Sequence, residues 1–225
     1  MVPVQVTSGE FDEGNATWSK DGAGMYFIST RVAEPYYDPP ISELYRIQAK
    51  GGAIEKVTGI QGQIGDYALS SDGKMIAFTG VLSRPVLSYS EPHVYVVSSA
   101  AGSTPKELAQ NSDLDFGEGV IGDQHPPRAE GNAGIFWAGD GKSVVQLVAE
   151  KGTANLRQID VASGRVTPIT TGNHEIMTWT ATPDGSKVVV NISTTTNIGD
   201  LFLLGQGGRL TRLTNSNERL LAELN

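Results

Sequence analysis

The stretch Trp18-Ser19-Lys20-Asp21-Gly22-Ala23-Gly24-Met25-Tyr26-Phe27-Ile28-Ser29 decides the fold, because its pattern recurs three more times along the 225 residues. In each copy an Asp-Gly pair separates a short segment from a strongly apolar run. Asp bonds to nearby backbone amides and Gly accepts positive φ without steric cost, so each copy predicts two strands joined by a tight turn. The four pairs are Asp21-Gly22, Asp72-Gly73, Asp140-Gly141 and Asp184-Gly185.

Two further strands follow each hairpin and are separated by a glycine-containing turn. Their spacing supports the register: fourteen residues separate Thr7 from Asp21, Thr58 from Asp72, and Thr170 from Asp184. In the third copy thirty residues separate Gln110 from Asp140, which predicts an insertion of sixteen residues. Four-stranded units that repeat every forty to fifty residues are typical of propeller blades.

We therefore predict an all-β chain, a β-propeller region of four blades, each a four-stranded antiparallel sheet. It would be a fragment of a larger propeller of seven or eight blades. The predicted segments are an orphan outer strand at 2–7, blades at 15–58, 64–110, 132–170 and 176–214, an inserted loop at 111–131, and a junction at 215–225.

The bulky residues before each turn are predicted to be core residues. Positions three and five residues ahead of the Asp share one face of a strand, and one bulky residue is kept per pair. By this argument the tryptophans Trp18, Trp137 and Trp179 pack between blades and form no ligand cage.

Charge and composition exclude several function classes. Lys and Arg number 17 against 25 Asp and Glu, a formal net charge of −8, which argues against a nucleic-acid or anionic-membrane surface. With no cysteine, the chain has no disulfide framework, thiolate metal site or cysteine nucleophile. No apolar run is long enough for a membrane helix, and the chain is expected to be soluble, in a bacterial cytoplasm or periplasm.

The repeat resembles that of a known family. Trp-Ser-x-Asp-Gly, an apolar strand, Leu-Tyr-x-Ile, Gly-Gly and Val-Thr together look like propeller repeats of the prolyl oligopeptidase family, in particular of acylaminoacyl peptidase and dipeptidyl aminopeptidase relatives. The repeat also resembles that of the periplasmic Tol propeller protein. Three segments are similar to the peptidase branch: the first hairpin loop at 30–40, the loop at 114–128, and the junction at 213–224.

The resemblance implies a propeller that precedes an α/β-hydrolase domain with a Ser, Asp and His triad. This chain contains no Gly-x-Ser-x-Gly nucleophile elbow, and the Glu pair with which some dipeptidyl peptidases hold a substrate amino terminus has no convincing counterpart. We expect a non-catalytic propeller that gates or positions peptide substrates. Its expected partners are a hydrolase domain outside this chain and the peptide substrate.

Two polar or aromatic loops are candidates for facing a substrate or a partner domain. One is the proline-flanked tip formed by Tyr36, Tyr37 and Asp38, for which a rigid structural loop is an equal alternative. The other is the insertion, for which a solvated loop is the alternative; its candidate residues are Asp115, Glu118, Asp123, His125 and Arg128. The three histidines have no metal-ligand spacing, so we predict no metal site and no cofactor.

Other functions remain open at the level of the sequence. A free-standing binding or scaffold propeller of the Tol type needs no hydrolase domain. A propeller enzyme such as an oligogalacturonide lyase needs clustered His and Gln ligands, and the scattered histidines weigh against it. Apolar faces of the first and last blades also predict association with a second copy.

Overall fold

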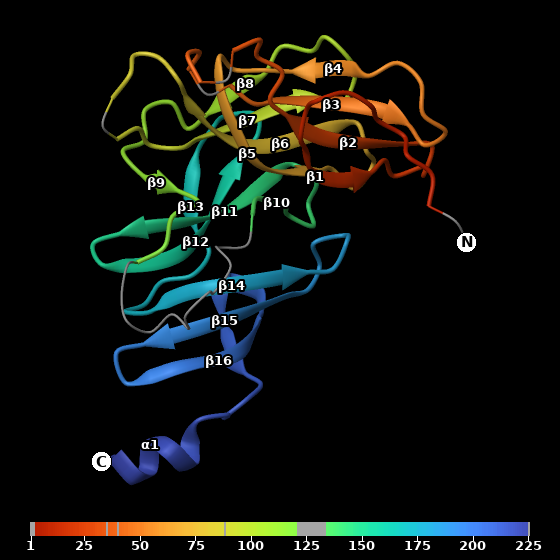
Figure 1. Cartoon of the computed structure of the whole chain (residues 1–225). Helices are drawn as coiled ribbons and strands as arrows, with labels where there is room; N and C mark the ends of the chain where they lie inside the picture. Colours follow the sequence, from red (N-terminus) through yellow and green to blue (C-terminus); the bar gives the residue numbers. More distant parts are fainter. Residues whose placement is uncertain (1–2, 35, 40, 88, 121–133, 225) are drawn as a thin grey trace. The chain divides into compact units, whose positions relative to one another are not determined.

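The computed structural model describes residues 3–34, 36–39, 41–87, 89–120 and 134–224. It divides into two compact units, Met1–Leu108 and Ala109–Asn225. Each unit is built of antiparallel sheets (Figure 1), and the described part holds one α-helix of seven residues, α1 (Glu218–Leu224). None of its helices has the length and hydropathy needed to cross a membrane.

Unit 1 contains two four-stranded sheets whose strands follow chain order. In both, each strand pairs with the next one along the chain, as expected for consecutive hairpins. The first sheet comprises β1 (Glu13–Trp18), β2 (Gly24–Ser29), β3 (Glu43–Gln48) and β4 (Glu55–Thr58); the second comprises β5 (Gly62–Leu69), β6 (Met75–Leu82), β7 (His93–Ser98) and β8 (Lys106–Leu108).

Unit 2 repeats this plan twice. A single parallel bridge between Ala154 and Glu175 joins its two groups of strands. The first group comprises β9 (Asp115–Phe116), β10 (Phe136–Trp137), β11 (Ser143–Glu150), β12 (Thr153–Asp160) and β13 (Val166–Pro168); the second comprises β14 (Glu175–Ala181), β15 (Val188–Thr194), β16 (Asn197–Leu204) and β17 (Leu210–Arg212), with a 3-10 turn η1 (Gln206–Gly208).

The Asp-Gly turns form as predicted. Gly22 has φ of +69°, which a residue with a Cβ rarely adopts, and the Asp21 carboxylate accepts a hydrogen bond from the Ala23 N–H at 3.0 Å. The hydroxyl of Ser19 also donates to Asp21 at 2.6 Å, and Ser70 and Thr182 do the same in their turns. The third turn has Ala138 at the hydroxyl position, and there the Asp140 carboxylate accepts hydrogen bonds from the N–H and the hydroxyl of Ser143 instead. Local side-chain bonds therefore fix all four turns.

The sixteen-residue insertion lies inside a strand rather than before one. Every first strand is irregular in its middle: the register shifts between Gly14 and Thr17, and shifts likewise in β5 and β14. In the third repeat β9 and β10 both pair with β11, and Phe116 and Trp137 are 21 residues apart where the equivalent step is five residues elsewhere. The predicted boundary at 111 is thus displaced, since Asp115–Phe116 already belongs to the sheet. A bulge accepts extra residues without breaking the flanking pairs.

The core of unit 1 lies between its two sheets. The side chains that meet there include Leu44 and Val57 from the first sheet and Ile76 and Phe78 from the second, all fully buried. Tyr67 spans the two sheets, because its hydroxyl donates to the backbone carbonyl oxygens of Asn15 and Tyr26 at 2.6 and 2.8 Å. Burial raises the pKa of Tyr67 to about 12, which keeps the phenol a hydrogen-bond donor at neutral pH.

The core of unit 2 contains β11, β12, β14 and β15. Leu147, Leu156 and Ile176 are fully buried in it. Trp179 occupies the position equivalent to Tyr67 and packs against Phe136, with ring centroids 4.1 Å apart. This agrees with the predicted core role of Trp179.

The predicted core role of Trp18 is wrong. Trp18 is 57% exposed, whereas Trp137 at the same position of its repeat is 8% exposed. The register places Trp18 beside Met25 on the sheet face opposite to the one that packs on the second sheet, and the described residues do not cover the ring. Repeat position fixes which face a side chain lies on, and burial depends on what packs against that face.

The orphan strand predicted at 2–7 is not assigned as a strand: residues 3–8 form no sheet hydrogen bonds among the residues described. The prediction was of a strand whose neighbours lie outside this chain, and it stays a prediction.

Candidate functional site

The hairpin connections of unit 1 are much longer than those of unit 2. In unit 2 the connections from β11 to β12 and from β15 to β16 have two residues each, the minimum for a hairpin. At the equivalent places in unit 1, residues 30–42 join β2 to β3 and residues 83–92 join β6 to β7. Connections longer than the fold requires are common places for binding residues.

These two long connections border a groove of about 590 Å³ within unit 1. We call it the loop groove. Tyr37, Asp38 and Pro39 form one wall and residues 81–87 with Tyr89 and Ser90 form the other, with Gln63 from β5 between them. The loop groove brings the predicted residues Tyr37 and Asp38 to a concave surface. Tyr36 is 93% exposed and does not line the groove.

Both ends of the loop 30–42 are fixed. At one end Arg31 forms an ion pair with Glu13 at 2.7 Å and lies over the rings of Phe11 and Tyr45, 4.7 and 5.1 Å from their centroids. At the other end the Ser42 hydroxyl donates to the Ile64 carbonyl oxygen at 3.1 Å and accepts from the Ile64 N–H at 2.9 Å. These contacts therefore hold both ends of the loop that carries Tyr37 and Asp38 in place.

The second wall was missed by sequence reasoning. Val86 is 77% exposed, and Leu87 and Tyr89 are each 61% exposed. The signal was present in the sequence, since the ten residues 83–92 far exceed a tight hairpin connection and contain exposed-loop residues such as Arg84-Pro85.

The insertion in unit 2 is held by buried polar groups. Glu175, 3% exposed, accepts a hydrogen bond from the Val120 N–H at 3.0 Å, and the Gly117 N–H donates to the Leu147 carbonyl oxygen at 2.8 Å. Asp115 is half-buried in β9 and Glu118 is exposed. The other candidate residues, Asp123, His125 and Arg128, lie outside the described residues. The role proposed for this segment stays a prediction.

Neither described histidine lines the loop groove. The His93 Nδ1 is 2.7 Å from the Glu107 carboxylate, and burial lowers the pKa of His174, which favours its neutral form. In the ranges that the structure describes, no three His, Cys, Asp or Glu residues are grouped so that they could hold a metal ion.

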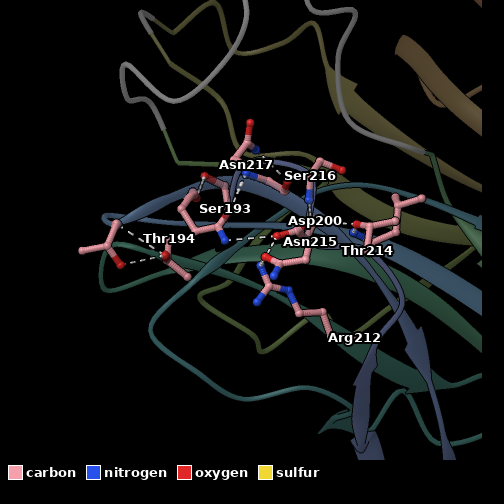
Figure 2. A network of polar contacts seen from close by, with 12 residues as sticks. Ser193, Thr194, Asp200, Arg212, Thr214, Asn215, Ser216 and Asn217 are labelled. Atoms are coloured by element: carbon pink, nitrogen blue, oxygen red, sulfur yellow. Dashed lines mark hydrogen bonds and ion pairs between the residues drawn. The ribbon is translucent and has the colours of Figure 1, made fainter. Parts of the chain in front are cut away.

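Asp200 organises a polar network at the end of the last sheet (Figure 2). Its carboxylate accepts hydrogen bonds from Arg212, from the Thr214 hydroxyl at 2.7 Å and from the Ser216 N–H at 2.9 Å. Burial opposes ionisation of this carboxyl, but the surrounding donors outweigh it and hold the pKa of Asp200 well below its usual range. The network fixes the segment that leads into α1 and is structural.

Comparison with known proteins defines the architecture. No family model and no curated protein sequence matches the chain. Several solved structures match. Puromycin hydrolase has a TM-score of 0.69 and 12% identity, and the match covers 95% of this chain and 32% of that one. TolB from Acinetobacter baumannii has a TM-score of 0.62 and 17% identity, with 93% of this chain and 45% of that one covered; the β-propeller domain of the Trilobed protease from Pyrococcus furiosus has a TM-score of 0.59 and 22% identity, with 91% and 52% covered.

The fold is that of a β-propeller. The resemblance expected from the repeat is confirmed at the level of fold, since peptidase propellers and Tol propellers are both among the matches. Identities below 25% carry no assignment of activity. The chain spans about half the length of the Tol and Trilobed protease propellers that it matches and about a third of puromycin hydrolase.

Proposed function

We propose that this chain is a non-catalytic propeller region that gates or positions peptide substrates for a serine peptidase domain outside these 225 residues. We also infer that each four-stranded group is one blade, so that the chain supplies four blades of a larger propeller. The observation that supports the gating role best is the loop groove, because the long connections that form it are additions to a repeat that needs only two-residue turns.

The similarity in fold to peptidase propellers is the reason for proposing a peptidase role. Several matched structures are hydrolases by their own descriptions, among them puromycin hydrolase and an acylaminoacyl peptidase in complex with a peptide chloromethyl ketone. The sequence contains no nucleophile elbow. A propeller without chemistry of its own acts on a peptidase reaction by restricting which substrates arrive and in what orientation.

The test uses the native protein purified from its source with an antibody against this chain. We expect it to cleave an unfolded octapeptide and to leave the same sequence uncut within a tightly folded domain. A serine-directed inhibitor bulky enough to occupy the substrate path should abolish both binding and turnover of the peptide. Equal cleavage of the folded and unfolded forms contradicts gating.

The second candidate is a scaffold propeller of the Tol type. The TolB match supports this alternative in the same way as the peptidase matches support the first, because all of them are likenesses of fold. Under this alternative the purified native protein carries no serine hydrolase activity and retains a stoichiometric protein partner.

A further inference from the structure

The loop groove has the chemistry of a peptide-binding surface. We infer that it binds extended peptide segments in which an aromatic or aliphatic side chain stands next to a basic residue. This inference deepens the proposed function and rests on it, because it names the class of peptide and places its contact on unit 1.

The walls of the loop groove carry four large apolar or aromatic side chains that are open to solvent. Tyr37 is 88% exposed, Val86 77%, and Leu87 and Tyr89 61% each. Soluble proteins rarely gather so much apolar surface around one concavity unless something binds there. An aromatic or aliphatic side chain between Tyr37 and Leu87 would remove part of this surface from water on both walls.

The size of the loop groove selects the kind of occupant. A volume of about 590 Å³ lies within the usual range for pockets that enclose small ligands and short peptide segments. It is bordered by the two long connections, together with Gln63 of β5 and the end of β6 at Val81 and Leu82. A few residues of extended chain fit this shape, whereas a folded domain would contact only the loop tips.

The charges of the lining predict which peptides are preferred. Asp38 presents an exposed carboxylate on one wall and Arg84 an exposed guanidinium on the other. Asp38 is placed to pair with a basic side chain, and Arg84 offers several N–H donors for peptide carbonyl oxygens. The whole chain carries −8, so its field attracts basic peptides and repels acidic ones.

The walls are also stiffened before any peptide arrives. Pro39 and Pro85, one in each wall, restrict the backbone angle φ. Arg31 and Ser42 fix the ends of the first loop, as described above. Binding to a preformed groove loses less conformational entropy than binding that must order both loops.

Fluorescence polarisation with a labelled octapeptide, Gly-Ala-Lys-Phe-Ala-Lys-Phe-Gly, tests the inference on the 225-residue chain. Tyr37→Ser and Leu87→Ser should each weaken binding about tenfold, as expected for truncated contact residues. Asp38→Asn should weaken it about threefold at low salt, and the effect should shrink as salt rises. A peptide with Glu in place of Lys should bind less well, and one with Ser in place of Phe should bind weakest.

The matched control is Tyr36→Ser. Tyr36 lies in the same loop, is equally exposed and does not line the groove, so its variant should bind the Lys-Phe peptide within about twofold of the original chain. All these residues are exposed, and unchanged thermal unfolding of each variant shows that the fold is intact. The inference is overturned if the original chain does not bind the Lys-Phe peptide, if Tyr36→Ser and Tyr37→Ser weaken binding equally, or if the Glu-Phe peptide binds as tightly.

This result is separable from the proposed function. Peptide binding is measured without any peptidase domain, and the serine hydrolase assays of the native protein do not depend on the loop groove. Loss of groove specificity together with retained hydrolase activity would reject this inference alone.

Discussion

The carboxylate of Asp200 accepts a hydrogen bond from the backbone N–H of Ser216 at 2.9 Å, which ties β16 to the segment that enters α1 (Figure 2). Thr214 is held from both sides, since its hydroxyl donates to Asp200 and accepts from the Leu201 N–H at 2.9 Å. A single buried carboxylate thus orients the exit of the chain from its last sheet.

Removal of this charge should destabilise unit 2. Asp200→Asn weakens the bonds from Arg212, Thr214 and Ser216 together, and we expect a loss of about 2 kcal/mol in the free energy of unfolding. Urea unfolding followed by tryptophan fluorescence measures it. Asp12→Asn, at an exposed position, is the control and should change stability by less than about 0.5 kcal/mol. Equal effects of the two substitutions would show that the network adds no stability.

The same carboxyl predicts a dependence on pH. The folded pKa of Asp200 lies below its unfolded value of about 3.8, so its contribution is complete above that pH and is lost as the pH falls toward the folded pKa. Asp184, whose pKa is lowered to about 2 by its hydrogen bonds from Thr182 and Ser186, acts in the same direction. Urea midpoints from pH 6 down to pH 3 should decline less steeply for Asp200→Asn than for the original chain. Parallel curves would contradict this assignment.

Truncation of the two tryptophans at one repeat position should lower stability by very different amounts. Trp137→Ala removes a ring that is 8% exposed and should cost about 3 to 5 kcal/mol, whereas Trp18→Ala removes one that is 57% exposed and should cost less than about 1 kcal/mol. Thermal unfolding of both variants tests the contrast. A cost below about 1 kcal/mol for Trp137→Ala would mean that its strand faces are assigned the wrong way round.

The outer face of β14 to β17 should promote self-association. Leu201 and Leu203 lie on this face and are 42% and 36% exposed, and Leu203 pairs with Val189. Light scattering after size exclusion at micromolar concentration should give a mass above 23.9 kDa, and the double substitution Leu201→Ser and Leu203→Ser should lower it to the monomer. The control is Ile198→Ser, because Ile198 is also exposed but lies near the opposite end of β16 from Leu203. A strictly monomeric original chain would rule out this association.

Features that depend on neighbouring residues, such as the tight turns, were predictable from the sequence. The Asp21-Gly22 turn and its three counterparts depend on bonds within five residues, and all four formed as expected. The size of the insertion was also predictable from spacing. Its place was not, because the pairing of Phe116 with Val148 is a contact between distant residues that spacing cannot reveal.

Burial and grooves depended on packing that no local pattern encodes. Trp18 and Trp137 share a repeat position, and only the neighbouring surfaces decide which ring is covered. For the candidate site, the aromatic tip at Tyr37 was evident from the sequence. Its opposite wall at Val86 and Leu87 was not, because the two loops meet only through the packing of β2 and β3 against β5 and β6.

The most direct test of the central claim is to label the native protein with a fluorophosphonate, which reacts with activated serine nucleophiles, and to map the modified residue by mass spectrometry. The account predicts one modified serine in the polypeptide that carries this chain, located outside residues 1–225, and no turnover of acylaminoacyl or dipeptidyl substrates by residues 1–225 alone. A modified serine within residues 1–225, or an unlabelled native polypeptide of 23.9 kDa, would contradict it.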